Sequence, residues 1–395
     1  MIFQLQRYSI DTDRRELTLS GKAVHVEPQV FDLLVFLIEN RDRVVSKDEL
    51  FSAVWKGRIV SDATLSSRIS AARRAIGDDG EKQAYIRTIA RHGFLFAGEL
   101  IKTESKAHAP EAVGQPERRQ NITFCKTPEG IRLAVATVGD GSNLVKTANW
   151  LNHLDYDWRS PFWQPLLQAL ASSHQLVRYD ARGTGLSDWN AQEISFDAFV
   201  RDLETVVDAL GLERFSLFGM SQGAAVAATY AARHSERVDK LVLHGAYAQG
   251  RRRRNSLEDE DQANALTTLM RYGWAKEHSP FMQAFSSIYF PKATTEQVRW
   301  FIELQRVSTS SENALRIRRA CDNIDIVDLL PTIRTPTLVT HCRYDNVAPF
   351  EQARLIAAAI PNARLVPLES ENHAILPDEV VWPTWLREIE DFLAG

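Results

Sequence analysis

The chain has 395 residues, of which 44% are hydrophobic and 25% charged, and its formal net charge is −4. This length predicts two or three domains, and the composition excludes collagen-like and disordered classes. The longest apolar run, residues 30–38, is too short to cross a bilayer, and no export-signal pattern opens the sequence. Three widely spaced cysteines favour neither a disulfide framework nor a zinc site. We therefore expect a cytoplasmic protein without a membrane partner, a metal or a cofactor.

Charge is distributed unevenly along the chain. Residues 58–98 contain seven basic and four acidic residues, although the whole chain is acidic. A local excess of positive charge is expected where one edge of a domain contacts phosphate groups. Many neutral surfaces carry such patches, so the elements predicted in the same region must support the interpretation.

The chain begins with strand-like segments and a helix. The segments lie at residues 7–10, 16–19 and 23–26. An apolar periodic stretch follows, with Pro28 just inside its start and Asn40 near its end. Proline is favoured at the first helical position, and asparagine is favoured near a helix end, so these residues bracket the first predicted helix.

Two further helices are predicted before residue 77. Ser46 and Glu49 have the spacing of a capping box, which starts a helix that runs to about Trp55. Another helix begins at Asp62, and its buried stripe consists of apolar residues at helical spacing. That stripe is Leu65, Ile69, Ala72 and Ile76. Its opposite face carries hydroxyl and guanidinium groups, namely Ser66, Ser67, Ser70, Arg73 and Arg74.

Residues 85–97 alternate around Arg91, His92 and Gly93, as a β-hairpin would. The whole region resembles the winged helix-turn-helix of OmpR/PhoB-type response regulators, on the segments EPQVFDLLVFLIENRDRVVSKDEL, TLSSRISAARRAIGD and YIRTIARHGFLF. The resemblance implies that helix 62–76 reads the major groove of double-stranded DNA and that the hairpin is the wing. The residues expected at the DNA are Ser66, Ser67, Ser70, Arg73, Arg74, Thr88, Arg91 and His92.

The sequence departs from that family at one informative place. Positions 70 and 71, often basic in the family, are Ser70 and Ala71, so the base preference of relatives does not carry over. A winged helix retained only for protein contacts is the alternative interpretation. Because such domains often bind tandem half-sites, a homodimer is the expected assembly.

The predicted domains are 1–100 for the winged helix, 101–120 for a solvated linker without apolar periodicity, and 121–395 for the remainder. After a hairpin-like opening, strand and helix signals alternate through the last domain. This alternation predicts an α/β fold with a mostly parallel sheet covered on both faces. Polar residues at the carboxyl ends of its strands are then the candidate active residues.

Residues 219–223 read Gly-Met-Ser-Gln-Gly between a strand-like run and an alanine-rich helix, which predicts a nucleophile elbow at Ser221. Asp345 and His373 each follow a later predicted strand. A serine hydroxyl needs a neutral imidazole to take its proton, and a carboxylate to orient that imidazole. Ser221, His373 and Asp345 are therefore the predicted catalytic triad. Three other acids before the histidine are alternatives to Asp345: Asp322, Asp325 and Asp328.

From about residue 121 to the end, the chain resembles the α/β-hydrolase superfamily, on the triad order and on RYDARGTGLSD at 178–188. The resemblance implies an oxyanion hole formed by the amide of Gln222 and a second amide, which we align with Trp150 although relatives have His-Gly there. It also implies a helical lid at about 246–330, whose aromatic residues favour an apolar ligand pocket. The arginines at 251–254 are expected to be solvated and paired with Glu258, Asp259 and Glu260.

Three functions follow from this combination. The first is a one-component transcriptional regulator whose hydrolase domain senses, and hydrolyses, a small ester-, lactone- or amide-type effector. The second is a carboxylesterase-like acyl hydrolase in which the DNA-binding module is incidental. The third is a catalytically idle receptor that keeps the triad only to bind its ligand. The fusion itself favours the first, because a free esterase gains nothing from a groove-reading helix.

Overall fold

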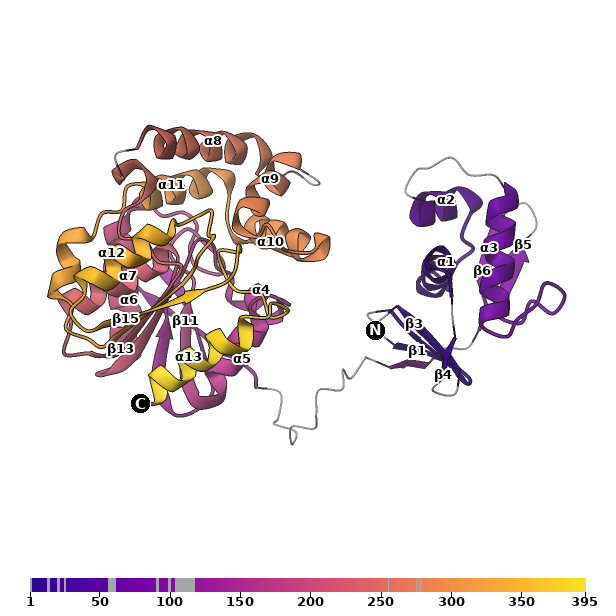
Figure 1. Ribbon diagram of the computed structural model, residues 1–395, viewed down its shortest axis with the longest axis horizontal. Helices are drawn as coiled ribbons and strands as arrows, with labels where there is room; N and C mark the ends of the chain where they lie inside the picture. Colours follow the sequence, from indigo (N-terminus) through magenta and orange to yellow (C-terminus); the bar gives the residue numbers. More distant parts are fainter. Residues whose placement is uncertain are drawn as a thin grey trace. The chain divides into compact units, whose positions relative to one another are not determined.

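The computed structural model describes residues 2–12, 15–19, 22–24, 26–55, 62–89, 92–98, 101–103, 118–254, 256–274, 276 and 279–395. The chain divides into two compact units, Met1–Gly114 and Gln115–Gly395 (Figure 1). The boundary falls within the predicted linker. None of the helices in the described ranges is both long and apolar enough to span a bilayer.

The first unit combines a five-stranded antiparallel sheet with three helices and a two-stranded hairpin (Figure 1). The sheet has the order β4-β3-β2-β1-β7. Its strands are β1 (Ile2–Leu5), β2 (Tyr8–Asp11), β3 (Glu16–Leu19), β4 (Lys22–Val24) and β7 (Ile101–Thr103). The helices are α1 (Pro28–Glu39), α2 (Lys47–Trp55) and α3 (Asp62–Ala75), and the hairpin is β5 (Ile86–Ile89) with β6 (Gly93–Phe96).

Local capping interactions in this unit agree with the sequence. Pro28 is the first residue of α1, and Asn40 ends that helix. The Glu49 amide donates to Ser46 Oγ at 3.2 Å, and the Ser46 amide donates to Glu49 Oε2 at 2.8 Å. This reciprocal pair is the predicted capping box, because it satisfies two amides that the first turn of α2 leaves free.

Two strands of this sheet, β1 and the edge strand β7, were not predicted. β1 pairs with β2 on one side and with β7 on the other, so residues 101–103 belong to the first unit and not to the linker. This corrects the predicted linker start at residue 101. Such short strands show no periodicity of their own, and the pairing depends on an edge supplied by a distant part of the chain.

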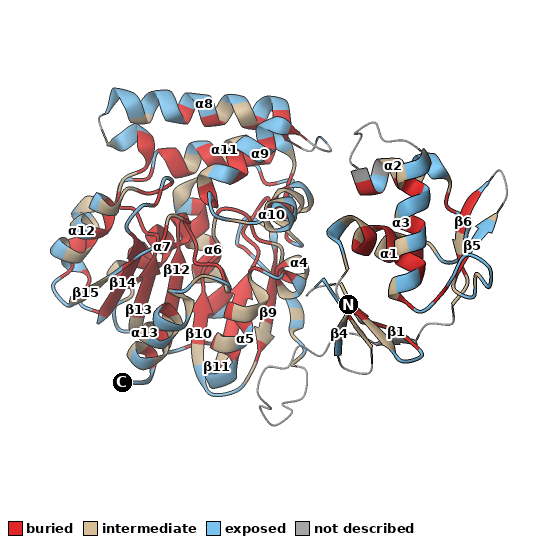
Figure 2. Cartoon of the chain, turned by 45° about the vertical axis from the view of Figure 1, so that its right-hand side comes forward, coloured by how far each residue is buried: buried red, intermediate tan, exposed pale blue. Residues whose placement is uncertain are grey.

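The second unit is built on an eight-stranded sheet with the order β15-β14-β13-β12-β10-β11-β9-β8. Only the pairings of β8 and β9 are antiparallel. The strands are β8 (Asn121–Lys126), β9 (Arg132–Val138), β10 (Ser142–Lys146), β11 (His174–Tyr179), β12 (Phe215–Met220), β13 (Val238–His244), β14 (Thr337–Cys342) and β15 (Ala363–Leu368). The central strands are buried on both faces, which explains their nearly continuous apolar sequences (Figure 2).

Helices cover both faces of this sheet, as the alternating pattern predicts. In Figure 1, α5 (Gln164–Ser173) and α13 (Trp382–Ala394) lie on one face, and α6 (Phe196–Ala209) and α7 (Gln222–Arg233) lie on the other. α12 (Phe350–Ala359) packs against β14 and β15, and the short α4 (Leu154–Arg159) packs against β9. Because strands β10 to β15 run parallel, their carboxyl ends lie along the same end of the sheet, and this end is the edge meant below.

Among the described residues between β13 and β14, four α-helices are inserted, and they lie above that edge (Figures 1 and 2). They are α8 (Leu257–Gly273), α9 (Pro280–Tyr289), α10 (Thr295–Ser308) and α11 (Ser311–Asp322). They occupy the stretch for which a helical lid is expected. Several of their aromatic side chains are buried and belong to the core of the same unit: Trp274, Phe285, Tyr289, Phe290 and Phe301.

Candidate active site

Ser221 lies at the sharp turn between β12 and α7, where its backbone adopts φ 53° and ψ −130°. The two flanking glycines allow this turn to pack closely. A Cβ atom on Gly219 would lie 2.6 Å from Ala224 Cα, and one on Gly223 would lie 2.4 Å from the Ala148 carbonyl oxygen. Such contacts are too short for any larger residue, so the glycine-serine-glycine pattern follows from the geometry of the turn.

Asp345 and His373 follow β14 and β15, and their side chains meet. His373 Nδ1 lies 2.7 Å from Asp345 Oδ2, while Asp345 Oδ1 accepts hydrogen bonds from the amides of Val347 and Ala348 at 2.7 and 3.1 Å. Burial alone raises the pKa of Asp345, but the charge and hydrogen bond of His373 outweigh it, so the net pKa is lowered. The carboxylate is therefore ionised at neutral pH and orients the imidazole.

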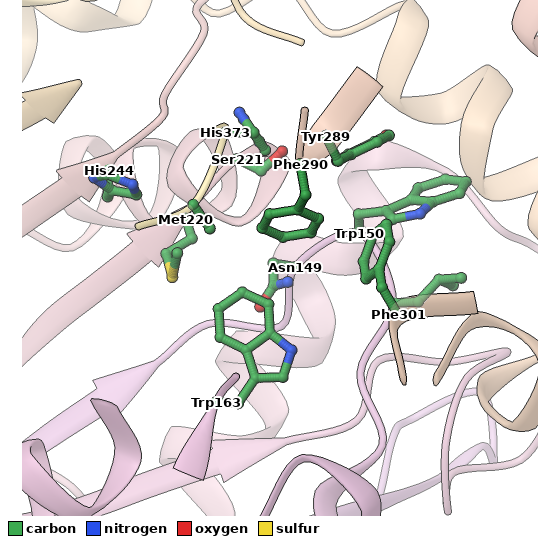
Figure 3. A pocket seen from close by; sticks show the side chains of 12 residues that line it. Asn149, Trp150, Trp163, Met220, Ser221, His244, Tyr289, Phe290, Phe301 and His373 are labelled. Atoms are coloured by element: carbon green, nitrogen blue, oxygen red, sulfur yellow. The ribbon is translucent and has the colours of Figure 1, made fainter. Parts of the chain in front are cut away.

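The side chains of Ser221 and His373 lie next to each other in one pocket (Figure 3). Aromatic and apolar side chains from α9, α10, β12 and several loops surround them. The pocket is lined by Asn149, Trp150, Leu151, Trp163, Met220, Ser221, His244, Tyr289, Phe290, Phe301, His373 and Ala374. The structure thus brings three residues from distant parts of the sequence to one edge of the sheet, below an apolar cavity.

The predicted oxyanion-hole amides lie beside this pocket. Gln222 is the first residue of α7, and neither its amide nor that of Trp150 has an acceptor among the described residues. The neighbouring Asn149 amide, in contrast, donates to Asn152 Oδ1 at 2.6 Å. Two free amides near a candidate nucleophile, one of them at the positive end of a helix, are suited to stabilise a developing oxyanion.

Lys146 supports the loop that carries Trp150, and it was not among the residues predicted from the sequence. Its ammonium group donates to Asn149 Oδ1 at 2.6 Å, and burial lowers its pKa to about 8. Thr147 Oγ1 next to it donates to the Gly223 carbonyl at 2.8 Å, which ties this loop to the turn at Ser221. A lysine at the end of a buried apolar strand was the available signal, because such a charge requires a local partner.

Two further histidines lie close to the triad. His341 is buried, its Nε2 lies 2.8 Å from the Ala348 carbonyl, and burial lowers its pKa. His244 lines the pocket and bonds Thr340 Oγ1 through Nδ1 at 2.8 Å, and burial lowers its pKa to about 3. Both imidazoles are neutral at pH 7, so neither adds positive charge to the candidate site.

The alternative acids are placed elsewhere. Asp322 is buried in an ion pair with Arg318, whose Nε lies 3.0 Å from Asp322 Oδ2. Asp325 and Asp328 are exposed. Arg318 also donates to the Tyr289 hydroxyl at 3.4 Å, so the helical insertion contains a buried polar cluster beside the pocket. Tyr289 is one of the lid aromatic residues from which the sequence predicts an apolar ligand pocket, whereas Arg318 was not selected, because it looks like an ordinary helix residue there.

The residues predicted to contact DNA are mostly exposed on α3 and on the hairpin. Ser66, Ser67, Ser70 and Arg74 are exposed on α3, and Thr88 and His92 are exposed on the hairpin. Arg91 lies outside the described residues. Because these side chains are exposed, they are accessible for the predicted contact with DNA.

Arg73 is the exception, and the prediction of a DNA contact for it is corrected. Only 7% of its surface is exposed, and its guanidinium donates to the Ile86 carbonyl from Nε and Nη2 at 3.0 and 2.7 Å. Nη2 also donates to Thr88 Oγ1 at 2.9 Å. Arg73 therefore joins α3 to β5. Helical spacing had placed Arg73 on the face opposite the apolar stripe, and periodicity alone cannot predict that the hairpin packs against this side chain.

Comparison with known proteins agrees with both folds. Residues 150–380 match the family model for the alpha/beta hydrolase fold, and residues 21–96 match the model described as transcriptional regulatory protein, C terminal. The chain belongs to the α/β-hydrolase family and carries an OmpR/PhoB-type DNA-binding domain in front of the hydrolase domain.

Individual relatives resemble one part or the other. The AB hydrolase superfamily protein YisY of Bacillus subtilis is 27% identical over 65% of this chain and 94% of its own length. The "Putative carbamate hydrolase RutD" of Caulobacter sp. is 30% identical over 52% of this chain and 75% of its own. The transcriptional activator CadC of Escherichia coli is 32% identical over 29% of this chain and 25% of its own. An esterase structure from Exiguobacterium antarcticum is 25% identical, with a TM-score of 0.59 over 69% of this chain and 99% of its own.

Proposed function

We propose that this protein is a one-component transcriptional regulator. It binds double-stranded DNA through α3 and the wing, and it senses and hydrolyses a small ester-, lactone- or amide-type effector at Ser221. The observation that carries the catalytic half is the 2.7 Å contact between His373 and Asp345 beside the turn at Ser221. The DNA-binding half is supported by the exposed hydroxyl and guanidinium groups of α3.

In the proposed reaction, Ser221 Oγ attacks the carbonyl carbon while His373 Nε2 accepts the hydroxyl proton. Asp345 keeps the other imidazole nitrogen protonated and stabilises the imidazolium. The amides of Gln222 and Trp150 donate to the oxyanion of the tetrahedral intermediate, where a single donor contributes about 10²–10³ in rate. The imidazolium then protonates the leaving oxygen or nitrogen, and the acyl group stays on Ser221. Water attacks that acyl group by the same route and releases the free serine.

The substrate class follows from the pocket and from the relatives. Aromatic side chains such as Trp163, Phe290 and Phe301 line the cavity, which suits a compact apolar acyl or alcohol group. Relatives are named as an esterase and a carbamate hydrolase, and both names describe a carbonyl carbon bonded to a heteroatom. A serine at position 221 suits acyl transfer, whereas epoxide and haloalkane hydrolysis in this fold require a carboxylate there.

Binding of DNA is proposed for the exposed face of α3, where Ser66, Ser67 and Ser70 offer hydroxyl groups and Arg74 offers a charge. Hydroxyl groups can read base edges in the major groove, and an arginine neutralises a phosphate. A homodimer would place two copies of α3 on two half-sites. Hydrolysis of the effector would then reset the regulator after each signal.

The full-length protein tests the two halves separately. A fluorophosphonate probe should label the wild type and should not label Ser221→Ala, and mass spectrometry of the labelled peptide identifies the site. Duplexes that cover the promoter next to the protein's own gene should be retained in gel-shift assays at low salt. Labelling without DNA retention would favour an acyl hydrolase with an incidental DNA module. DNA retention without labelling would favour an idle receptor.

A further inference from the structure

Four consecutive arginines, Arg251–Arg254, precede α8, and two of them, Arg252 and Arg253, are exposed as the sequence predicts. Arg252 pairs with Glu260 at 3.5 Å, Arg254 pairs with Asp259 at 3.1 Å, and Arg253 is exposed. Arg251 does not fit this pattern, because only 5% of its surface is exposed. The prediction of a fully solvated arginine run is therefore wrong at Arg251 and also at Arg254, whose side chain is only 8% exposed although it forms the predicted pair with Asp259.

Arg251 is buried without a matching negative charge. Its Nη2 donates to the Val347 carbonyl at 2.9 Å, while its buried Nε has no hydrogen-bond partner. Within the described part of the chain, no carboxylate lies in ion-pair distance of this guanidinium. Asp322 contributes to its electrostatic environment but is engaged by Arg318.

Burial of the Arg251 charge is energetically unfavourable. Burial, with a smaller contribution from Arg318, lowers the pKa of Arg251 to about 10, so the side chain is still charged at neutral pH. A buried charge without a counter-charge costs free energy that a bound anion would recover.

Arg251 lines a second pocket of about 380 Å³, separate in its lining from the pocket at Ser221. Its other lining residues are the amides Gln262 and Asn346 and the apolar side chains Ala265, Leu266, Leu269 and Ile288. No acidic residue is among them, although one carboxylate lies next to the lining: Gln262 Nε2 donates to Glu258 Oε1 at 3.3 Å. The pocket thus combines one positive charge and two amides with a wall of aliphatic carbon.

We propose that this second pocket binds a small aliphatic carboxylate. The carboxylate is neutralised by Arg251 and hydrogen-bonded by the amides of Gln262 and Asn346, and the hydrocarbon chain packs against Leu266, Leu269 and Ile288. An inorganic oxyanion would leave the aliphatic wall uncovered, and a neutral alcohol would leave the guanidinium unpaired. The combination of charge and apolar wall therefore selects an organic anion.

The second pocket adjoins the candidate active site through two short connections. Asn346 follows Asp345 directly in the chain. Ile288 lines the second pocket, whereas Tyr289 lines the first, and the His373 amide donates to the Tyr289 carbonyl at 2.8 Å. A ligand at Arg251 thus contacts the residues next to those that hold the triad. The proposal does not require Ser221 to be catalytic, so the failure of one does not decide the other.

Isothermal titration calorimetry on the full-length protein tests the site with three probes: sodium hexanoate, hexan-1-ol and inorganic phosphate. Hexanoate should bind, and the other two should bind more weakly by about tenfold or more, because a charge-assisted contact and an apolar contact are each lost. Arg251→Gln should weaken hexanoate binding by about tenfold to a hundredfold. Arg253→Gln, in the same run but exposed, is the matched control and should change binding by less than about twofold.

A second variant tests the same pocket if Arg251→Gln does not fold. Leu269→Glu adds a negative charge to the half-buried wall of the pocket and should also abolish hexanoate binding, while circular dichroism shows an unchanged fold. The proposal is overturned if no hexanoate binding is measured, or if hexan-1-ol or phosphate binds as tightly as hexanoate. It is equally overturned if folded Arg251→Gln or Leu269→Glu protein binds hexanoate as the wild type does.

Discussion

Arg73 and Arg74 are adjacent in sequence, but their substitutions should have different effects. Substitution of Arg73 should lower the stability of the first unit, whereas substitution of Arg74 should weaken DNA binding. Arg73→Met keeps most of the side-chain volume but removes the guanidinium that joins α3 to β5. The buried Ile86 carbonyl then loses two hydrogen-bond donors, and Thr88 Oγ1 loses one. An unsatisfied buried acceptor costs about 1–3 kcal/mol, and a hydrogen bond to a charged group contributes about 1.5–3 kcal/mol. We expect the first unit to lose roughly 2–4 kcal/mol of its free energy of unfolding.

Arg74→Gln alters an exposed side chain and should leave that free energy within about 0.5 kcal/mol of the wild type. If Arg74 contacts a phosphate, the slope of log Kobs against log[salt] for DNA binding should fall by about 0.9. Hydrogen-exchange mass spectrometry of the full chain measures the local stability of α3 and β5, and fluorescence anisotropy against salt measures the slope. Unchanged exchange in Arg73→Met, together with a reduced salt slope, would refute the structural role of Arg73.

Three further predictions concern the hydrolase unit. Asp345→Asn should reduce turnover of p-nitrophenyl acetate by about 10⁴, because the imidazole loses its correct tautomer, and a loss below tenfold would contradict the triad. Gly223→Ala should abolish fluorophosphonate labelling, since the added Cβ would lie 2.4 Å from the Ala148 carbonyl oxygen; wild-type labelling would show that the turn tolerates a side chain. The pKa of His244, lowered to about 3, predicts that the folded state binds fewer protons than the unfolded state. As the pH is lowered from about 6.5 to about 3, the free energy of unfolding should therefore fall by up to about 1.4 kcal/mol per pH unit. Urea titrations of His244→Gln should show a shallower dependence, and an unchanged dependence would assign the effect to other groups.

Much of the fold is encoded in local patterns of the sequence. The capping box at Ser46 and Glu49 fixes the start of α2 through contacts within one turn, so three residues of spacing are enough to predict it. The turn at Ser221 is local only in part: Gly219 is required by the backbone of Gly223 and Ala224, whereas Gly223 is required by the Ala148 carbonyl, which belongs to a loop far away in the chain. Strand signals before Asp345 and His373 placed both residues at strand ends, and parallel strands end at a common edge.

The burial of individual polar residues was decided only by the tertiary structure. Arg73 and Arg251 both occur among exposed arginines, and nothing in their immediate sequence separates them from their neighbours. Arg73 is buried because the hairpin, more than ten residues further along the chain, offers it a carbonyl group. Arg251 is buried because the loop after β14, almost a hundred residues further along, packs over it. β7 likewise becomes a strand only because β1, at the other end of the unit, offers an edge. Periodicity and capping depend on residues within one or two turns, whereas burial and edge pairing depend on which distant segments the completed fold brings together.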